Sequence, residues 1–367
     1  MTGEAIELKG VTKTFPGSAT PAVAPLDLVL GAGEITVLIG PSGCGKTTTM
    51  RMINRLINPT DGVITIGGTD IREQSVTELR RGIGYVIQQI GLFPHRTIAQ
   101  NIATVPSLLK WPKAKTQDRV EELADLVGID RVMLGRYPAE LSGGQQQRVG
   151  VARALAADPP VLLMDEPFGA VDPIVRARLQ AELISLQERV HKTIVLVTHD
   201  IDEAISLGDK VAVLNVGGIV EQFAAPDELL ANPSNEFVAD FVGHERSIKR
   251  LSLSRVRDLD LQEGPVVGRS ATPEEARAVL ARTGSEWLGI TDDGTFQGWV
   301  PASDFHGESV RELDPQVAAA QVRPDATLRE ALEVILTARS STAVVLNDDG
   351  TYGGTVSLET IREGLGR

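Results

Sequence analysis

The chain has 367 residues, more than one ordinary domain needs, and 42% of them are hydrophobic while 23% are charged. This composition fits a globular protein of two or three domains, and no apolar run approaches the ~20 residues of a membrane-spanning helix. The net charge of −13 argues against an open nucleic-acid surface as the main partner, and the single cysteine, Cys44, excludes an intrachain disulfide and favours a reducing cytosolic compartment.

The N-terminal region predicts β-strands that lead into a phosphate loop. Residues 5–40 alternate apolar and polar side chains, as in IELKGVTKTF, with Gly and Pro between the segments. The run GPSGCGKTT that follows has the spacing G-x-x-x-x-G-K-T, in which backbone N–H groups turn onto nucleotide phosphates. Lys46 would supply a positive charge, and the hydroxyl of Thr47 can bind Mg²⁺. Residues 47–57 have helical spacing, as a strand–loop–helix phosphate site requires. A Gly-rich turn without a ligand is the alternative.

The middle of the chain predicts a helical region followed by two buried strands. Residues 113–160 read mostly as helix, interrupted at GRYPAE and at the run LSGGQQQR. VLLMD and TIVLVTH are short and continuously apolar, as in a parallel sheet covered on both faces, and residues 179–190 between them predict a crossover helix.

Acidic residues and a histidine end these two strands, at the edge where such sheets bind ligands. Asp165 would hold Mg²⁺ directly or through water, and Glu166 would polarise an attacking water beside the γ-phosphate. A solvated turn is the alternative for this acidic pair. A surface or packed residue is the alternative for His199.

Beyond about residue 243 the sequence repeats itself. A segment from Ala271 that ends in TDDGTFQGWV recurs from Ala326 and ends in NDDGTYGGTV, with one inserted residue. Each unit predicts helix, strand, Asp-Asp-Gly-Thr turn, strand and helix, so we expect a pseudo-twofold tandem module. The predicted domains are residues 1–245 and 246–367, and the repeats within the second span about 250–307 and 308–367.

The motifs described above occur in the order found in one ATPase family. Over roughly its first two thirds the chain closely resembles the ATP-binding subunits of ABC transporters, whose signature LSGGQ lies at residues 141–145. The tail resembles, on a shorter and more diverged repeat, a tandem pair of CBS (cystathionine-β-synthase-type) domains. The resemblance implies an α/β P-loop ABC ATPase with a mixed sheet core and a helical subdomain, followed by a tandem α/β CBS pair.

The resemblance implies a complete site for ATP and Mg²⁺. His199 would form hydrogen bonds with the γ-phosphate and with Glu166. Gln88, or Gln89 in the other register, would contact Mg²⁺ and the water nucleophile. Phe15 would stack on adenine, unless it packs in the core. The predicted catalytic residues are Glu166, His199, Gln88 and Lys46, and the predicted Mg²⁺ ligands are Thr47, Gln88 and Asp165. The predicted ATP-binding residues are Phe15, Gly40, Pro41, Ser42, Gly43, Cys44, Gly45, Lys46, Thr47, Thr48, Ser142, Gly143, Gly144, Gln145 and Asp172.

The signature residues imply a dimer, because in this family they do not reach the phosphate loop of their own chain. Ser142, Gly143 and Gly144 would close over ATP bound to a second copy, in a head-to-tail pair with Asp172 across the interface. A plain helix start capped by Ser142 is compatible with that role. The segment through Phe93 and His95 resembles the surface that receives a membrane subunit, with an ordinary buried aromatic as the alternative for Phe93.

The run TTTMRMINRLINPTDGVITIGG and the appended repeat resemble the ATPase subunits of importers for osmolytes such as glycine betaine, proline and choline. The resemblance implies permease partners, a substrate-binding protein acting through them, and a peripheral location on the cytoplasmic face of the inner membrane. The N-terminus lacks a basic-then-apolar leader, so we expect no secretion signal.

Other functions remain alternatives to osmolyte import. An importer of amino acids or another polar solute is the nearest. A soluble ABC ATPase of DNA repair or translation would usually fuse two cassettes or insert a long coiled coil, and this chain does neither. A sensor with a vestigial nucleotide site is opposed by the intact Lys46, Asp165, Glu166 and His199.

The tail predicts a regulatory role by ionic-strength sensing on anionic lipid or by binding an adenine nucleotide such as cyclic di-AMP. A dimerisation module without sensing is the alternative. The tail carries 14 Lys and Arg against 19 Asp and Glu, a net −5, which disfavours a broad lipid-binding face. Trp287 and Trp299, whose repeat counterparts are Thr342 and Thr355, predict core or interface packing rather than a cation-binding aromatic cage.

Overall fold

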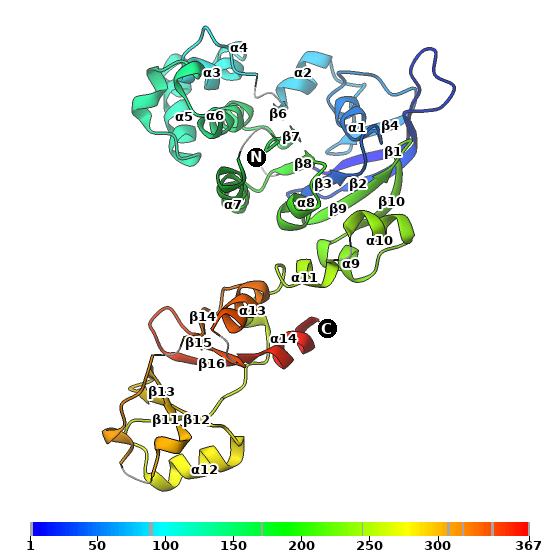
Figure 1. Cartoon of the computed structure of the whole chain (residues 1–367). Helices are drawn as coiled ribbons and strands as arrows, with labels where there is room; N and C mark the ends of the chain where they lie inside the picture. Colours follow the sequence, from blue (N-terminus) through cyan, green and yellow to red (C-terminus); the bar gives the residue numbers. More distant parts are fainter. Residues whose placement is uncertain are drawn as a thin grey trace. The chain divides into compact units, whose positions relative to one another are not determined.

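The computed structural model describes residues 3–87, 91–169, 172–243, 245–306, 309–317, 319–338 and 341–365. The chain divides into two compact units, Met1–His244 and Glu245–Arg367 (Figure 1). None of the helices in these ranges is both long enough and apolar enough to cross a membrane.

The first unit contains two sheets. The antiparallel sheet has the order β2-β1-β4-β5, formed by β1 (Ile6–Lys13), β2 (Val23–Leu30), β4 (Asp61–Ile66) and β5 (Thr69–Asp70). The other has the order β10-β9-β3-β8-β7-β6 and contains β3 (Ile35–Ile39), β6 (Ile83–Val86), β7 (Val161–Asp165), β8 (Thr193–Val197), β9 (Lys210–Asn215) and β10 (Ile219–Ala224). All of its neighbouring strands are parallel except β9 and β10. Both strands predicted as continuously apolar, β7 and β8, are buried along their whole length, as expected for the interior of a parallel sheet.

The three helical regions predicted for this unit are present with different bounds, and the structure contains further helices that were not predicted. They are α1 (Lys46–Ile53), α2 (Val76–Arg81), α3 (Ile98–Ile102), α4 (Thr104–Leu108), α5 (Lys113–Leu126), α6 (Gly143–Leu155), α7 (Pro173–Val190), α8 (Ile201–Leu207), α9 (Pro226–Ala231) and α10 (Glu236–Val242). Figure 1 shows α3 to α6 grouped together, apart from the antiparallel sheet. The crossover helix predicted between β7 and β8 is α7. The helix predicted over residues 47–57 ends at Ile53, and Arg55 just beyond it adopts a left-handed backbone with φ 46°.

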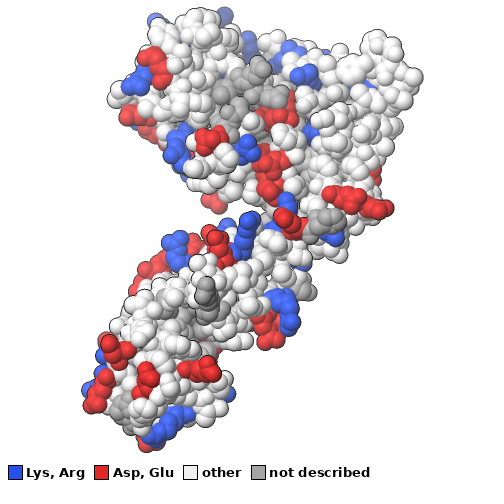
Figure 2. Space-filling view, in the orientation of Figure 1, with Lys and Arg blue, Asp and Glu red and all other residues white. Residues whose placement is uncertain are grey.

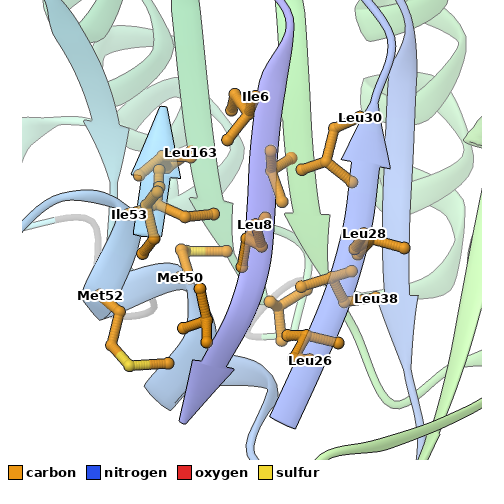
Figure 3. Close-up of a cluster of buried hydrophobic side chains, with 14 of the residues drawn as sticks. Ile6, Leu8, Leu26, Leu28, Leu30, Leu38, Met50, Met52, Ile53 and Leu163 are labelled. Carbon is orange, nitrogen blue, oxygen red and sulfur yellow. The ribbon is translucent and has the colours of Figure 1, made fainter. Parts of the chain in front are cut away.

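Helix α1 anchors the phosphate loop to the core. Its side chains Met50 and Ile53 belong to a buried cluster with Leu8 of β1 and Leu163 of β7 (Figure 3). All four side chains are completely buried. Burial of one such side chain contributes about 1.5–3 kcal/mol, so the cluster fixes α1 against both sheets.

The second unit contains two three-stranded sheets of the same design. One has the order β11-β12-β13, from β11 (Val266–Gly268), β12 (Trp287–Asp292) and β13 (Thr295–Pro301), and the other has the order β14-β15-β16, from β14 (Gln321–Val322), β15 (Thr342–Leu346) and β16 (Tyr352–Ser357). In each, the first pair is parallel and the second antiparallel. The short strands β11 and β14 had no signal in the sequence pattern.

The helices of the second unit are α11 (Arg246–Arg250), α12 (Pro273–Thr283), α13 (Leu328–Thr337) and α14 (Leu358–Leu365). The repeated helices begin alike, because Thr272 with Glu275 and Thr327 with Glu330 form matching capping boxes. The helix predicted at the end of the first repeat is wrong within the described residues, where only a 3₁₀ turn, Ala302–Asp304, follows β13. The run PASDFHGES there is rich in weak helix formers, whereas LETIREGL after β16 is not.

Candidate active site

Three neighbouring strands of the large sheet end at one edge and carry the predicted site residues. Strand β8 lies between β3 and β7, and all three are parallel. Val197 pairs with Leu38 on one side and with Asp165 on the other. The phosphate loop, the acidic pair and His199 therefore leave the sheet side by side, as the carboxyl ends of parallel strands require.

The phosphate loop needs glycine at two positions for different steric reasons. Gly40 has φ 148°, and a Cβ there would collide with the carbonyl oxygen of Leu214. Gly45 has φ 98°, and its Cβ would lie 2.8 Å from the carbonyl oxygen of Ala22. Gly45 is also the N-cap of α1 and provides no side-chain cap. The backbone N–H groups at this helix start can therefore bind an anion.

Lys46 is held inside the loop. Its side chain is buried, and Nζ donates hydrogen bonds to the carbonyl oxygens of Gly40 at 2.6 Å and Pro41 at 3.1 Å. Cys44 is also buried, with Sγ 3.6 Å from the same Nζ, while Ser42 and Gly43 at the tip of the loop are exposed. The loop thus presents its tip and its charge to the space where phosphates would lie.

The side chains of Thr47 and Asp165 place oxygen atoms side by side. The Thr47 hydroxyl donates to Oδ1 of Asp165 at 3.1 Å, and Asp165 is 5% exposed. Burial raises the pKa of Asp165, while the bond from Thr47 and the charge of Arg51 oppose this rise. Within the described ranges no three His, Cys, Asp or Glu side chains are grouped around a metal site. A hydroxyl beside one carboxylate suits Mg²⁺, which binds proteins through few carboxylates and otherwise through phosphate oxygens and water.

Glu166 and His199 face each other across the ends of β7 and β8. His199 Nδ1 lies 3.4 Å from Oε1 of Glu166, and the His199 side chain is 68% exposed. The backbone N–H of Glu166 donates to the carbonyl of Val197 at 2.9 Å, and Glu166 adopts φ 45°. A left-handed backbone costs a non-glycine residue about 1–3 kcal/mol, and such strain concentrates at functional sites. The turn fixes the carboxylate beside the imidazole.

The signature residues form a helix start. The Gln145 N–H donates to Oγ of Ser142 at 3.3 Å, and the Ser142 N–H donates to Oε1 of Gln145 at 2.9 Å. Nothing lies within 4 Å of where a Cβ of Gly143 would be. At Gly144, a Cβ would lie 2.9 Å from Cγ1 of Val175, so the two helices pack closely there.

Asp172 caps α7 by accepting from the Val175 N–H at 3.1 Å, and the exposed Ser142 caps α6 in the same way. Among the residues that the structure describes, the hydrogen bonds of these two side chains stay at their own helix starts and do not reach the phosphate loop.

Two predicted aromatic residues lie at the surface. Phe15 is 42% exposed, with Nζ of Lys13 5.3 Å from its ring centroid, so the core-packing alternative is wrong. Phe93 is 38% exposed, and the Arg96 guanidinium lies 4.9 Å from its ring centroid, so it is not an ordinary buried aromatic. Gln88, with its alternative Gln89, lies outside the described residues.

Sequence reasoning missed a polar network behind His199. The Thr198 hydroxyl donates to Oε2 of the buried Glu203 at 2.6 Å, and burial raises the pKa of Glu203. Arg176 of α7 lies 3.4 Å from Asp200, which caps α8. The network ties the turn that carries His199 to α7 and α8. The run T-H-D-x-x-E was the available signal, since two polar residues flank the histidine and a glutamate follows on the first turn of a helix.

The strand-end geometry defines a P-loop nucleotide site with a buried aspartate and a carboxylate–imidazole pair. Residues 23–169 match the ABC transporter family model. The osmoprotectant import ATP-binding protein OsmV of Salmonella typhimurium is 46% identical over 367 residues, covering 98% of this chain and 96% of that protein. The glycine betaine/carnitine/choline transport ATP-binding protein OpuCA of Bacillus subtilis is 52% identical over 297 residues, covering 80% of this chain and 78% of that protein.

A solved structure of a bacterial ABC transporter cassette, in dimeric form, is also similar. It has a TM-score of 0.54 and 35% sequence identity and covers 60% of this chain and 98% of that one. The chain belongs to the ATP-binding subunits of ABC transporters. It is an ABC-type ATPase with the predicted α/β P-loop fold.

Proposed function

We propose that this chain hydrolyses ATP to drive a membrane importer of osmoprotectants such as glycine betaine, carnitine or choline. The observation that carries the proposal is the similarity to the osmoprotectant import subunit, which extends over 98% of this chain and therefore through both compact units. The ATPase cassette that all ABC ATPases share would explain sequence similarity in the first unit, but not in the second.

In this proposal the phosphate loop binds ATP and Glu166 acts as the general base. Loop N–H groups and Lys46 hold the β- and γ-phosphates, while Thr47 and Asp165 hold Mg²⁺, which would neutralise phosphate charge. Glu166 orients the attacking water and takes its proton, and His199 fixes the carboxylate and donates to the γ-phosphate. The 3.4 Å approach of His199 to Glu166 supports this division of roles.

Gln88 would complete the site beside Mg²⁺ and the water, and Phe15 would stack on adenine. The exposure of Phe15 supports stacking, because an exposed ring face is available to a planar base. Lys13 near that ring adds a positive charge close to where the nucleotide would bind.

The catalytic unit in this proposal is a head-to-tail dimer. Ser142, Gly143 and Gly144 would bind the γ-phosphate of ATP held by the second copy, with Asp172 at the same interface. Two observations support this arrangement: the start of α6 has open space at Gly143, and the similar cassette was solved as a dimer.

The membrane partner would dock near Phe93. The Phe93 ring is exposed with His95 and Arg96 against it, which gives an aromatic and basic surface next to the predicted Gln88 segment. The chain would act at the cytoplasmic face of the inner membrane, with permease subunits and, through them, a substrate-binding protein.

The second unit, close to the predicted domain 246–367, would be a tandem CBS-type regulatory module. The two sheets of identical order and the matching capping boxes support a duplicated module. Figure 2 shows acidic and basic side chains interspersed on its visible face, and the net charge of −5 over residues 246–367 favours ligand sensing over lipid binding.

Reconstitution with the permease partners tests the proposed function. We expect ATP hydrolysis to rise when the binding protein and glycine betaine are both supplied, and uptake to follow hydrolysis. Sulfate and an amino acid are the control solutes. Stimulation by either control and none by glycine betaine or choline would refute osmoprotectant import while leaving the ATPase intact.

A further inference from the structure

Three sets of backbone hydrogen bonds connect the two repeats of the second unit. Gln262 and Thr355 exchange N–H···O bonds of 3.2 and 2.9 Å, and Gln316 and Trp299 exchange two bonds of 2.8 Å. The two turns are joined as well, since Tyr352 donates its N–H to the Gly294 carbonyl at 3.0 Å. The space between the sheets therefore has a defined shape.

This space is a cavity of about 1120 Å³ to which both repeats contribute at corresponding positions. Trp287 and Thr342 are each the first residue of the middle strand of their sheet, and Trp299 and Thr355 correspond on the next strand. All four residues line the cavity. The duplication thus gives one wall two indoles and the opposite wall two hydroxyl-bearing side chains.

The indole of Trp299 is held in place by its neighbours. Its ring meets Phe296 edge-on at a centroid distance of 5.4 Å, and Phe296 stacks on Tyr352 at 5.8 Å. Gly289 lies directly opposite Trp299, and a Cβ there would be 2.9 Å from Cζ3 of that indole. Only glycine leaves room for the ring to lie across the strand, so this aromatic wall is rigid.

Trp287 extends the same wall and is open to a ligand. It lies two residues before Gly289 on β12 and so faces the same side of the sheet as Trp299. The Trp287 N–H donates to Oγ of Ser285 at 3.1 Å, which fixes its backbone, yet the residue is 47% exposed. Core packing is therefore wrong for Trp287, and interface packing of this residue stays a prediction, while Trp299 packs against Phe296.

Two opposite charges line the same cavity. Arg282 Nη2 lies 3.9 Å from Oε2 of Glu263, with side chains 65% and 90% exposed, and both residues line the cavity. Because both side chains of this ion pair are largely exposed, their interaction is weak, and each can bind another ion. Among the lining residues that the structure describes, they are the only Lys, Arg, Asp or Glu residues.

We propose that this aromatic end of the cavity binds a small zwitterion with a quaternary ammonium group and a carboxylate. A quaternary ammonium has no N–H donor and is recognised by aromatic faces and a nearby carboxylate, which Trp287, Trp299 and Glu263 supply. The guanidinium of Arg282 suits the carboxylate of such a ligand. The volume of the cavity is larger than that of one such molecule, so the aromatic corner defines the site and water fills the remaining space.

The proposal rests on the proposed function, because the solutes named for the relatives include this class of zwitterion. A site for the transported solute on the ATPase subunit would let accumulated solute regulate its own uptake. The binding test below needs neither hydrolysis nor a membrane partner, so it can fail while the proposed import function stands, and the reverse also holds.

The test titrates the purified full-length protein with glycine betaine by isothermal calorimetry. We expect saturable binding that Trp287→Ala weakens about tenfold or more, the range expected for a desolvated cation–π contact. Trp111→Ala is the matched control, since it removes an indole that lies outside the cavity, and it should leave affinity unchanged. Both variants should hydrolyse ATP at the wild-type basal rate.

Arg282→Gln separates the two halves of the ligand. We expect it to weaken glycine betaine about tenfold and to leave choline, which has no carboxylate, unchanged. Absence of saturable glycine betaine binding to the wild-type chain, or an unchanged affinity in Trp287→Ala, would overturn the proposal. Equal weakening of both ligands by Arg282→Gln would overturn the carboxylate contact. If the wild-type chain binds AMP but not glycine betaine, and Trp287→Ala abolishes AMP binding, the cavity is a nucleotide site instead.

Discussion

Replacing Asp165 with Asn should stabilise the nucleotide-free protein while impairing its function. The side chain is 5% exposed, accepts one hydrogen bond from Thr47, and ends a fully buried strand. Asparagine keeps the shape of the side chain and an oxygen to accept the Thr47 bond. It removes a negative charge whose nearest buried cation, Lys46, donates instead to two loop carbonyls.

The expected gain in the free energy of unfolding is about 1 kcal/mol at neutral pH, the size typical when a functional residue that costs stability is replaced. For a cooperative unit of the size of Met1–His244, which contains Asp165, that raises Tm by about 2–4 °C. Burial raises the pKa of Asp165, so ionisation costs stability only above the ordinary value of 3.8. The cost appears as pH rises through the window from 3.8 to the raised pKa and is complete at higher pH. The advantage of the variant should therefore shrink as pH is lowered into that window.

Thermal unfolding of both proteins, with EDTA and with Mg²⁺ and ATP, measures this trade-off. A ligand at 100 times its Kd stabilises a protein by about 2.7 kcal/mol, so saturating Mg²⁺ and ATP should raise the wild-type Tm above that of the variant. A variant less stable than wild type in EDTA at neutral pH would refute the argument that the buried carboxylate is costly. Equal stabilisation of both proteins by Mg²⁺ and ATP would refute its role as a ligand.

Three further predictions concern the site and the tail. Glu166→Gln should lower steady-state hydrolysis by on the order of 10²-fold or more and let ATP hold a dimer detectable by gel filtration, whereas near-normal turnover would show that the base is another residue. Subunits with Lys46→Ala or with Ser142→Arg should each be nearly inactive alone, while a mixture of the two regains at most one intact composite site per heterodimer. If the Ser142→Arg protein hydrolyses ATP at the wild-type rate with its membrane partner, the shared site is contradicted. Truncation after Gly243 should keep ATP hydrolysis but remove the response of the reconstituted transporter to salt, nucleotide or internal solute, and an unchanged response would exclude regulation by the tail.

The sequence alone predicted the main parts of the site because each has a local signature. The spacing from Gly40 to Thr47, the acidic pair after an apolar strand and the histidine after another are all readable without knowing the fold. The parallel sheet then follows from the two continuously apolar strands, and it brings these ends together because β8 lies between β3 and β7. The proximity of His199 to Glu166 could be anticipated only through the family resemblance.

Other features depended on tertiary context and left little local trace. The left-handed backbone of Glu166 is held by a bond to Val197, thirty-one positions later in the numbering, and no local pattern predicts it. Thr198 and Glu203 lie in one short run, but Arg176 joins their network from a separate helix, and no local pattern predicts that contact. Exposure of Trp287 was also unpredictable, since a large aromatic on a strand is usually buried and only the pairing of the two repeats opens a cavity beside it.

The central claim is that this chain couples ATP hydrolysis to osmoprotectant import, and uptake by sealed vesicles tests it most directly. Vesicles containing the chain and its permease partners, with ATP on the side of the ATPase, should accumulate radiolabelled glycine betaine supplied with its binding protein. Accumulation should stop in vesicles that carry Glu166→Gln, although ATP still binds. Accumulation that continues in those vesicles, or wild-type vesicles that hydrolyse ATP without moving glycine betaine, choline or carnitine, would contradict the claim.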